Sequence, residues 1–140
     1  AHKEGSGLTM RSRVVEALGV FYVLDQMKMF MAMQAAGGMV SFQQEWFSGN
    51  VSPDILMPAD TSAEIIARLV LEKLKEKPDH PQLDLMVSHD FTIYLLKDQL
   101  LDQDSTHYPD VIYLDGIAVF ERDGTAFIQS HHEPAVELRV

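Results

Sequence analysis

Two side chains that can exchange protons stand next to each other in the dipeptide His89-Asp90, between an apolar stretch and a leucine-rich stretch. If these stretches are a strand and a helix, the pair lies beyond the carboxyl end of a strand, where α/β sheets bind ligands. A helix N-terminus there offers N–H groups and a partial positive charge, which suits phosphate. The histidine can donate to a phosphoryl oxygen, and the carboxylic acid can protonate a leaving alcohol. An aspartate cap beside a histidine that bonds nearby backbone fits the dipeptide equally well.

The residues on either side of the dipeptide predict the elements that would position it. Residues 83–88 are mostly apolar and follow Pro81, which predicts a short buried strand. A helix is expected over residues 91–101. Ser88 is expected to be structural rather than a nucleophile, because no glycine elbow surrounds it.

A further helix precedes this strand. Thr61 and Glu64 have the spacing of a capping box, apolar residues recur behind them, and Pro78 would end the helix. A helix, a buried strand and a second helix in succession predict α/β layering.

The N-terminal part predicts a long helix and a long connection. Apolar residues recur at three- and four-residue spacing over residues 9–36, and a glycine pair follows. The methionine-rich run at 27–33 fits flexible core filling, or a pliable wall of a substrate cleft or partner groove. Residues 37–60 are rich in turn formers and long for a connection, so they predict a variable insertion or lid loop, or a surface loop anchored by its aromatic residues.

The C-terminal part predicts strands. Residues 117–122 and 125–130 predict a β-hairpin, because the Asp-Gly pair between them is a strong two-residue turn signal. Residues 112–114 predict a further strand, and the tail from His131 onward is expected to be loose.

Composition narrows the class of protein. The 140 residues are 46% hydrophobic and suffice for a single domain or domain fragment spanning 1–140. Eleven basic and 21 acidic residues give a net charge of −10, which disfavours nucleic-acid binding but not a small phosphate ester in a pocket. The absence of cysteine excludes disulfides, thiolate metal sites and cysteine nucleophiles. No apolar run approaches the roughly 20 residues that a membrane span needs.

Three other groups of polar residues are weaker candidates for chemistry. His107 and Asp110 fit a surface loop better than an acid–base pair. The triplet 131–133 (His-His-Glu) lacks partners for a metal site, and adjacent histidines usually point apart. Asp102 and Asp104 lack the full ligand set of a calcium loop. The sequence therefore predicts neither a metal site nor a cofactor.

Residues 88–93, Ser-His-Asp-Phe-Thr-Ile, with the leucine-rich helix behind them, resemble the C-terminal His-Asp motif of the histidine phosphatase superfamily. The likeness is greatest to its acid phosphatase and phytase branch. Residues 10–17 resemble the family's middle segment, in which an arginine starts a helix. Arg13 matches its phosphate-binding arginine, and Arg11 is the alternative because one sequence does not fix the register.

The resemblance implies a fold as well. It implies a three-layer helix–sheet–helix arrangement, phosphoglycerate-mutase-like, represented here by its C-terminal part with a terminal β-hairpin. The expected order is an arginine helix, a variable insertion, a capped helix, a strand, the His-Asp pair, a helix and terminal strands.

The reaction that the resemblance implies is phosphomonoester hydrolysis through a phosphohistidine. A histidine within Arg-His-Gly attacks phosphorus, Asp90 protonates the departing alkoxide, and water then releases phosphate while Asp90 acts in reverse. His89 and Arg13 hold the phosphoryl oxygens. None of the six histidines follows an arginine, so Arg-His-Gly is absent from this chain, which alone is expected to be inactive.

A second function from a different class stays open. The chain could be a catalytically inactive module that binds a phosphorylated ligand or an interaction partner. A phosphomutase of the same superfamily is disfavoured because that branch usually places its acid elsewhere. The expected ligand is a small phosphorylated substrate or inorganic phosphate. Substrate identity, compartment and oligomeric state are open.

Overall fold

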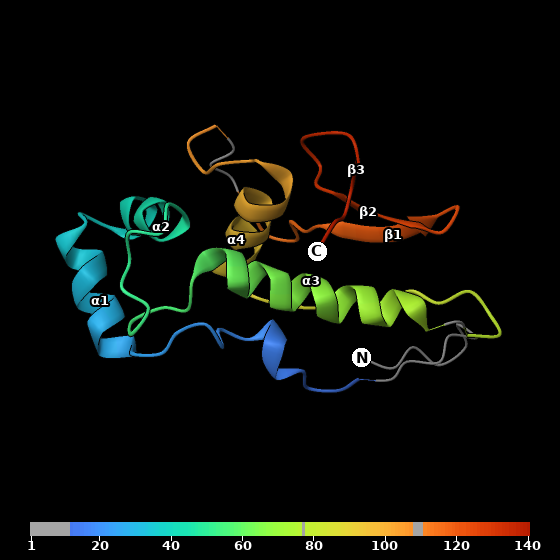
Figure 1. Ribbon diagram of the computed structural model, residues 1–140, viewed down its shortest axis with the longest axis horizontal. Coiled ribbons are helices and arrows are strands. Elements are labelled where there is room, and N and C mark those ends of the chain that lie inside the picture. The colour runs from blue at the N-terminus through green and yellow to red at the C-terminus, as the bar shows by residue number, and fades with distance from the viewer. Residues whose placement is uncertain (1–11, 77, 108–110) are drawn as a thin grey trace.

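The computed structural model describes residues 12–76, 78–107 and 111–140, which contain four α-helices, a short 3₁₀ helix and a three-stranded antiparallel sheet (Figure 1). In chain order these elements are η1 (Glu16–Leu18), α1 (Gln26–Ala35), α2 (Met39–Phe47), α3 (Ala59–Lys75), α4 (Asp90–Leu101), β1 (Ala118–Arg122), β2 (Thr125–Gln129) and β3 (Val136–Glu137). Helices and a sheet are therefore both present, as expected. Within the described residues no helix has the length and apolar character to span a membrane.

The helices enclose one apolar core, and α3 carries a second core under the sheet. The first core collects buried side chains from α2, α3, α4, the loop between α2 and α3, and the segment before α1, namely Tyr22, Phe42, Trp46, Leu56, Ala59, Ala63, Ile66 and Leu95. The second joins Ala67 of α3 to Ile128 of β2 and Leu138. The long helix α3 thus contributes to both cores, and Figure 1 shows its central position.

The predicted helix over 9–36 is wrong for most of its length. Of the described residues before α1, only η1 is helical, and residues 9–11 lie outside the described part. Tertiary pairing explains the difference, because residues 22–25 exchange backbone hydrogen bonds with residues 55–57. Asp25 then caps α1 by accepting from the Lys28 amide at 2.9 Å. The predicted end at the glycine pair is confirmed, since Gly37 and Gly38 follow α1 with φ of 88° and 132°.

The irregular chain expected over 37–60 begins instead with the helix α2. Phe42 and Trp46 lie four residues apart on its inner face and are both buried. The Trp46 indole donates to the Met57 carbonyl at 2.8 Å, which closes the irregular residues 48–58 over this helix. The four-residue spacing of these two aromatic residues therefore indicates a helix, although the turn formers around them predicted irregular chain.

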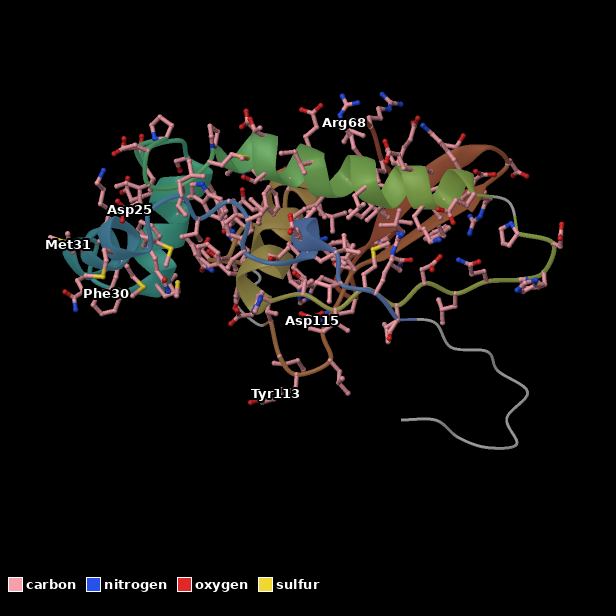
Figure 2. The ribbon with its side chains drawn as sticks, turned by 90° about the horizontal axis from the view of Figure 1, so that it is seen from below. Asp25, Phe30, Met31, Arg68, Tyr113 and Asp115 are labelled. Carbon is pink, nitrogen blue, oxygen red and sulfur yellow. The ribbon has the colours of Figure 1, made fainter. Side chains whose placement is uncertain are left out.

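The methionines of the run at 27–33 lie on two faces of α1. Met29 and Met33 pack against the core, whereas Met27 and Met31 are exposed. Figure 2 shows Met31 and Phe30 at the outer end of the molecule, away from α3. Flexible core filling therefore describes only the inner half of the run.

The helix predicted before Pro78 is confirmed as α3, but its capping box is wrong. The helix begins at Ala59, so Thr61 is already inside it and Pro58 is the N-cap. Ser62 donates its hydroxyl hydrogen to the Pro58 carbonyl at 2.9 Å. Lysines occupy the last turn, where they suit the negative end of the helix dipole.

The C-terminal hairpin is confirmed as β1 and β2. Asp123 and Gly124 have φ of 52° and 80°, the positive values that the tight turn between twisted strands requires. The tail predicted to be loose contains the two-residue strand β3, which pairs with β2, and is otherwise irregular. The strand predicted over 112–114 is wrong, since these residues form an exposed turn closed by a hydrogen bond from the Asp115 amide to the Ile112 carbonyl at 3.0 Å.

Candidate functional site

His89 and Asp90 lie at the start of α4, as the sequence predicted. His89 is the N-cap in an extended conformation, and its carbonyl accepts from the amides of Thr92 and Ile93 at 3.1 Å. Asp90 is the first helical residue, and its carboxylate accepts from the Phe91 amide at 2.7 Å. Both side chains of the pair are exposed. A histidine and a carboxylate are thus presented to solvent beside the positive end of a helix dipole.

The first turn of α4 rests on buried aromatic rings. Phe91 stacks on Trp46 with 5.1 Å between ring centroids, and Tyr22 lies 5.1 Å from Trp46 and 5.8 Å from Phe91. The Tyr22 hydroxyl and the Thr92 hydroxyl share a hydrogen bond of 2.9 Å. The rings therefore anchor the first turn of α4, which begins with the His-Asp pair.

The ionisation of Tyr22 reports on its surroundings. Burial raises the pKa of Tyr22 to about 12, the hydrogen bond with Thr92 opposes this rise, and the charge of Asp90 adds to it. Tyr22 was not among the sequence-predicted site residues, and only its apolar spacing marked it as a core residue.

The strand predicted over 83–88 is wrong, because this segment is extended but pairs with no other strand in the described residues. Leu83, Leu85 and Val87 are 91%, 86% and 78% exposed, so the alternation of a strand is present while its apolar face is uncovered. Ser88 donates its hydroxyl hydrogen to the Leu18 carbonyl at 2.6 Å. Its predicted structural role is therefore confirmed.

Arg13 does not lie at the start of a helix. It is exposed in the irregular residues that precede η1, and within the described part of the chain it has no hydrogen bond or ion pair to His89 or Asp90. Arg11 lies outside the described residues. The structure therefore places His89 and Asp90 next to each other, and the role of Arg13 in phosphate binding stays a prediction.

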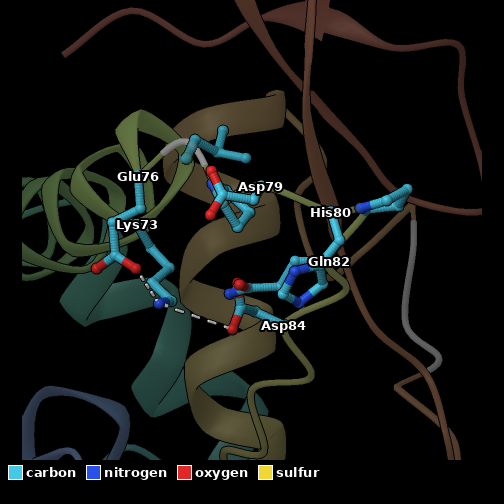
Figure 3. Close-up of a pocket in the computed structure, with 9 residues that line it drawn as sticks. Lys73, Glu76, Asp79, His80, Gln82 and Asp84 are labelled. Atoms are coloured by element: carbon cyan, nitrogen blue, oxygen red, sulfur yellow. Dashed lines mark hydrogen bonds and ion pairs between the residues drawn. The ribbon is translucent and has the colours of Figure 1, made fainter. Parts of the chain in front are cut away.

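A hollow lies elsewhere, beyond the C-terminal end of α3. It has a volume of about 490 Å³ and is lined by Lys73, Leu74, Glu76, Pro78, Asp79, His80, Pro81, Gln82 and Asp84 (Figure 3). Lys73 occupies its wall and forms ion pairs with Glu76 and, at 3.9 Å, with Asp84. A smaller hollow of about 260 Å³ lies between α3, α4 and the C-terminal residues. His89 and Asp90 line neither of these two hollows.

Sequence reasoning missed a buried ion pair behind the candidate site. The Lys97 ammonium lies 2.6 Å from the Asp115 carboxylate, and the two side chains are 1% and 2% exposed. Asp115 also accepts from the Gly116 amide at 2.7 Å and lies 3.0 Å from the Nδ1 atom of His131. Burial by itself would raise the pKa of Asp115, but the hydrogen bond and charge of Lys97 outweigh it and lower the pKa.

The pair ties the middle of α4 to the segment that leads into β1. The sequence does carry a signal for Lys97, because this residue lies four positions from both Ile93 and Leu101 and so shares their face of the helix. In the structure, every neighbouring position of this helix is at least half-buried. Within the described residues, no group of three histidine or acidic side chains is placed to hold a metal ion.

Comparisons with known proteins assign no role to this site. No family model, no curated protein and no solved structure matches the chain. What the chain offers is an exposed His-Asp pair at the N-terminus of α4, aromatic rings that anchor the first turn of this helix, and an uncovered extended segment leading into it.

Proposed function

We propose that this chain is the C-terminal part of a phosphomonoester hydrolase similar to the histidine acid phosphatases and phytases, in which His89 binds the phosphoryl group and Asp90 is the proton donor. The observation that carries the proposal is the placement of His89 and Asp90 side by side, exposed, at the N-terminus of α4. Such a position combines hydrogen-bond donors, a partial positive charge and a carboxyl group within reach of one phosphate ester.

The reaction proceeds in two displacements. A nucleophilic histidine forms an N–P bond as the ester O–P bond breaks, and Asp90 gives its proton to the departing alkoxide oxygen. Water then attacks the phosphohistidine, and Asp90 accepts the proton of that water while the N–P bond breaks. His89 holds phosphoryl oxygens in both steps. The nucleophile belongs to an Arg-His-Gly segment that these 140 residues do not contain.

The proposal includes the three-layer helix–sheet–helix fold, with α3 and α4 among its helices. Support comes from Leu83, Leu85 and Val87, which alternate along the segment before His89 and are all highly exposed. Apolar side chains left uncovered in this way suit a segment over which a further layer of the fold packs. We place Arg13 in the phosphate site as part of the same proposal.

A second function is favoured by one specific observation. Because the sequence contains no Arg-His-Gly, the chain suits a catalytically inactive module that binds a phosphorylated ligand. Both functions share the phosphate-binding role of His89 and differ in whether turnover follows.

Calorimetric titration with inorganic phosphate tests what the two functions share. We expect a saturable site that His89→Ala removes. The matched control is His107→Ala, because His107 is an exposed histidine whose only described partners lie in its own turn. Absence of a saturable site in the unaltered chain rules out the binding module, and the hydrolase is then tested in the longer chain.

The sequence of the natural message upstream of Ala1 then separates the two functions. The hydrolase requires that it encodes Arg-His-Gly and that the longer chain hydrolyses phosphate esters. In that longer chain, Asp90→Asn should slow esters with poor leaving groups more than p-nitrophenyl phosphate, because a good leaving group needs no proton. Equal rates for the variant and the unaltered enzyme on a poor leaving group contradict the role of Asp90.

A further inference from the structure

Two hydrogen bonds link residues 18–22 to the segment that carries the candidate site. The Ser88 hydroxyl donates to the Leu18 carbonyl at 2.6 Å, and the Thr92 hydroxyl shares a hydrogen bond of 2.9 Å with the Tyr22 hydroxyl. Each joins residues that are 70 positions apart in the sequence. One bond lies immediately before His89 and the other lies two residues after Asp90, so the pair is held on both sides.

The bond between Tyr22 and Thr92 is buried, so neither hydroxyl readily changes its hydrogen-bond partner. Tyr22 is 0% exposed and Thr92 is 1% exposed, and the Tyr22 ring is packed against Phe91 and Trp46. If either hydroxyl turned away, both would remain in an apolar environment without a partner, which is unfavourable. This bond therefore fixes how the first turn of α4 is rotated about its axis.

Helix geometry relates the orientation of Thr92 to that of Asp90. Thr92 follows Asp90 by two residues, and two residues of an α-helix turn through about 200°. Fixing Thr92 against the core therefore directs Asp90 towards the opposite, solvent-facing side of the helix. The bond from Ser88 fixes the residue before His89, which holds the extended backbone of this N-cap.

We propose that Ser88 and Thr92 are positioning residues, which set the orientation of His89 and Asp90 through their bonds to Leu18 and Tyr22. The functional meaning of this orientation rests on the proposed phosphate site. The orientation itself does not depend on any ligand, so it is measured separately from binding.

The experiment compares Ser88→Ala and Thr92→Val, which delete one hydroxyl each, with Ser41→Ala as a control on the exposed face of α2. Nuclear magnetic resonance follows the His89 imidazole and the Asp90 amide. Vanadate titration gives the affinity of the site. We expect both deletions to move the His89 and Asp90 resonances and to weaken vanadate binding about three- to tenfold, the effect of one typical hydrogen bond. The conservative variants Ser88→Thr and Thr92→Ser should restore both properties.

The double variant Tyr22→Phe/Thr92→Val guards against simple unfolding, because it leaves neither hydroxyl buried and unpaired. We expect it to stay folded and still to show moved His89 and Asp90 resonances. Folded variants with unmoved His89 and Asp90 resonances overturn the positioning role. Moved resonances in a chain that binds no vanadate uphold the positioning role and overturn the phosphate function instead.

Discussion

Replacing Lys97 with methionine removes the ammonium group that neutralises the buried carboxylate of Asp115. The two groups are 2.6 Å apart and almost fully enclosed. Breaking such a pair from one side costs about 3–5 kcal/mol of unfolding free energy, because a buried charge loses its counter-ion. Asp115 keeps the Gly116 amide and His131 as partners, so we expect a value near the lower end of this range.

Urea unfolding followed by the fluorescence of Trp46, the only tryptophan of the chain, measures this cost. With a slope of about 1.5 kcal/mol/M, a loss of about 3 kcal/mol lowers the unfolding midpoint by roughly 2 M. The double variant Lys97→Met/Asp115→Leu should recover most of the loss, because apolar replacement of a whole buried pair is often neutral.

The matched control is Lys28→Met, which removes an exposed lysine that is paired with Asp54 at 2.7 Å. Solvent screening makes such a surface pair weak, so its midpoint should hardly change. The reasoning is refuted if Lys97→Met unfolds at the same urea concentration as Lys28→Met. It is refuted as well if the double variant is as unstable as the single one.

The remaining predictions concern Tyr22, the turn of the hairpin and the uncovered segment. Because the folded pKa of Tyr22 is raised to about 12, its contribution to stability is complete below the unfolded pKa of about 10 and is lost as the pH rises through 12. Spectroscopic titration of the phenolate should show this transition, and Tyr22→Phe should remove it. Asp90→Asn should lower the pKa of the transition, and an unchanged pKa in this variant contradicts an effect of the Asp90 charge on Tyr22. Gly124→Val should lower the unfolding midpoint, since φ at this position is 80°, whereas Gly116→Val, at a glycine without positive φ, should change it less. Amide hydrogen exchange should be fast over residues 83–87, which pair with no described strand, and slow in α3; equal protection of the two would show that the segment is covered.

Local patterns in the sequence were sufficient where an element depends on its own residues. The helix before Pro78, the helix after His89 and the Asp123-Gly124 hairpin follow from periodicity and turn chemistry, and all three are present. The helix predicted over 9–36 fails because residues 22–25 pair with a segment about 30 positions away, which no local pattern reveals.

Residues 83–88 show a different limit. Their alternation is that of a strand, and the backbone is extended, but a strand also needs a neighbour, and none of the described residues provides one. A sequence window predicts the conformation of such a segment better than its pairing.

The candidate site, too, could be predicted from the sequence only in part. His89 and Asp90 could be placed at the start of a helix from the motif and its flanks, because those residues are contiguous. The bonds from Ser88 and Thr92 join residues far apart in the chain, as does the Lys97–Asp115 pair, so their partners could not be read from spacing. Arg13 was expected on a helix that does not form there, and its role in phosphate binding stays a prediction.

The most direct measurement of the central claim is a vanadate titration of the isotopically labelled chain, followed residue by residue. We expect saturable shifts that centre on His89, Asp90 and the first turn of α4, and that disappear in His89→Ala but persist in His107→Ala. Shifts centred on the hollow around Lys73 and His80, or no saturable shifts at all, would contradict a phosphate site at the start of α4.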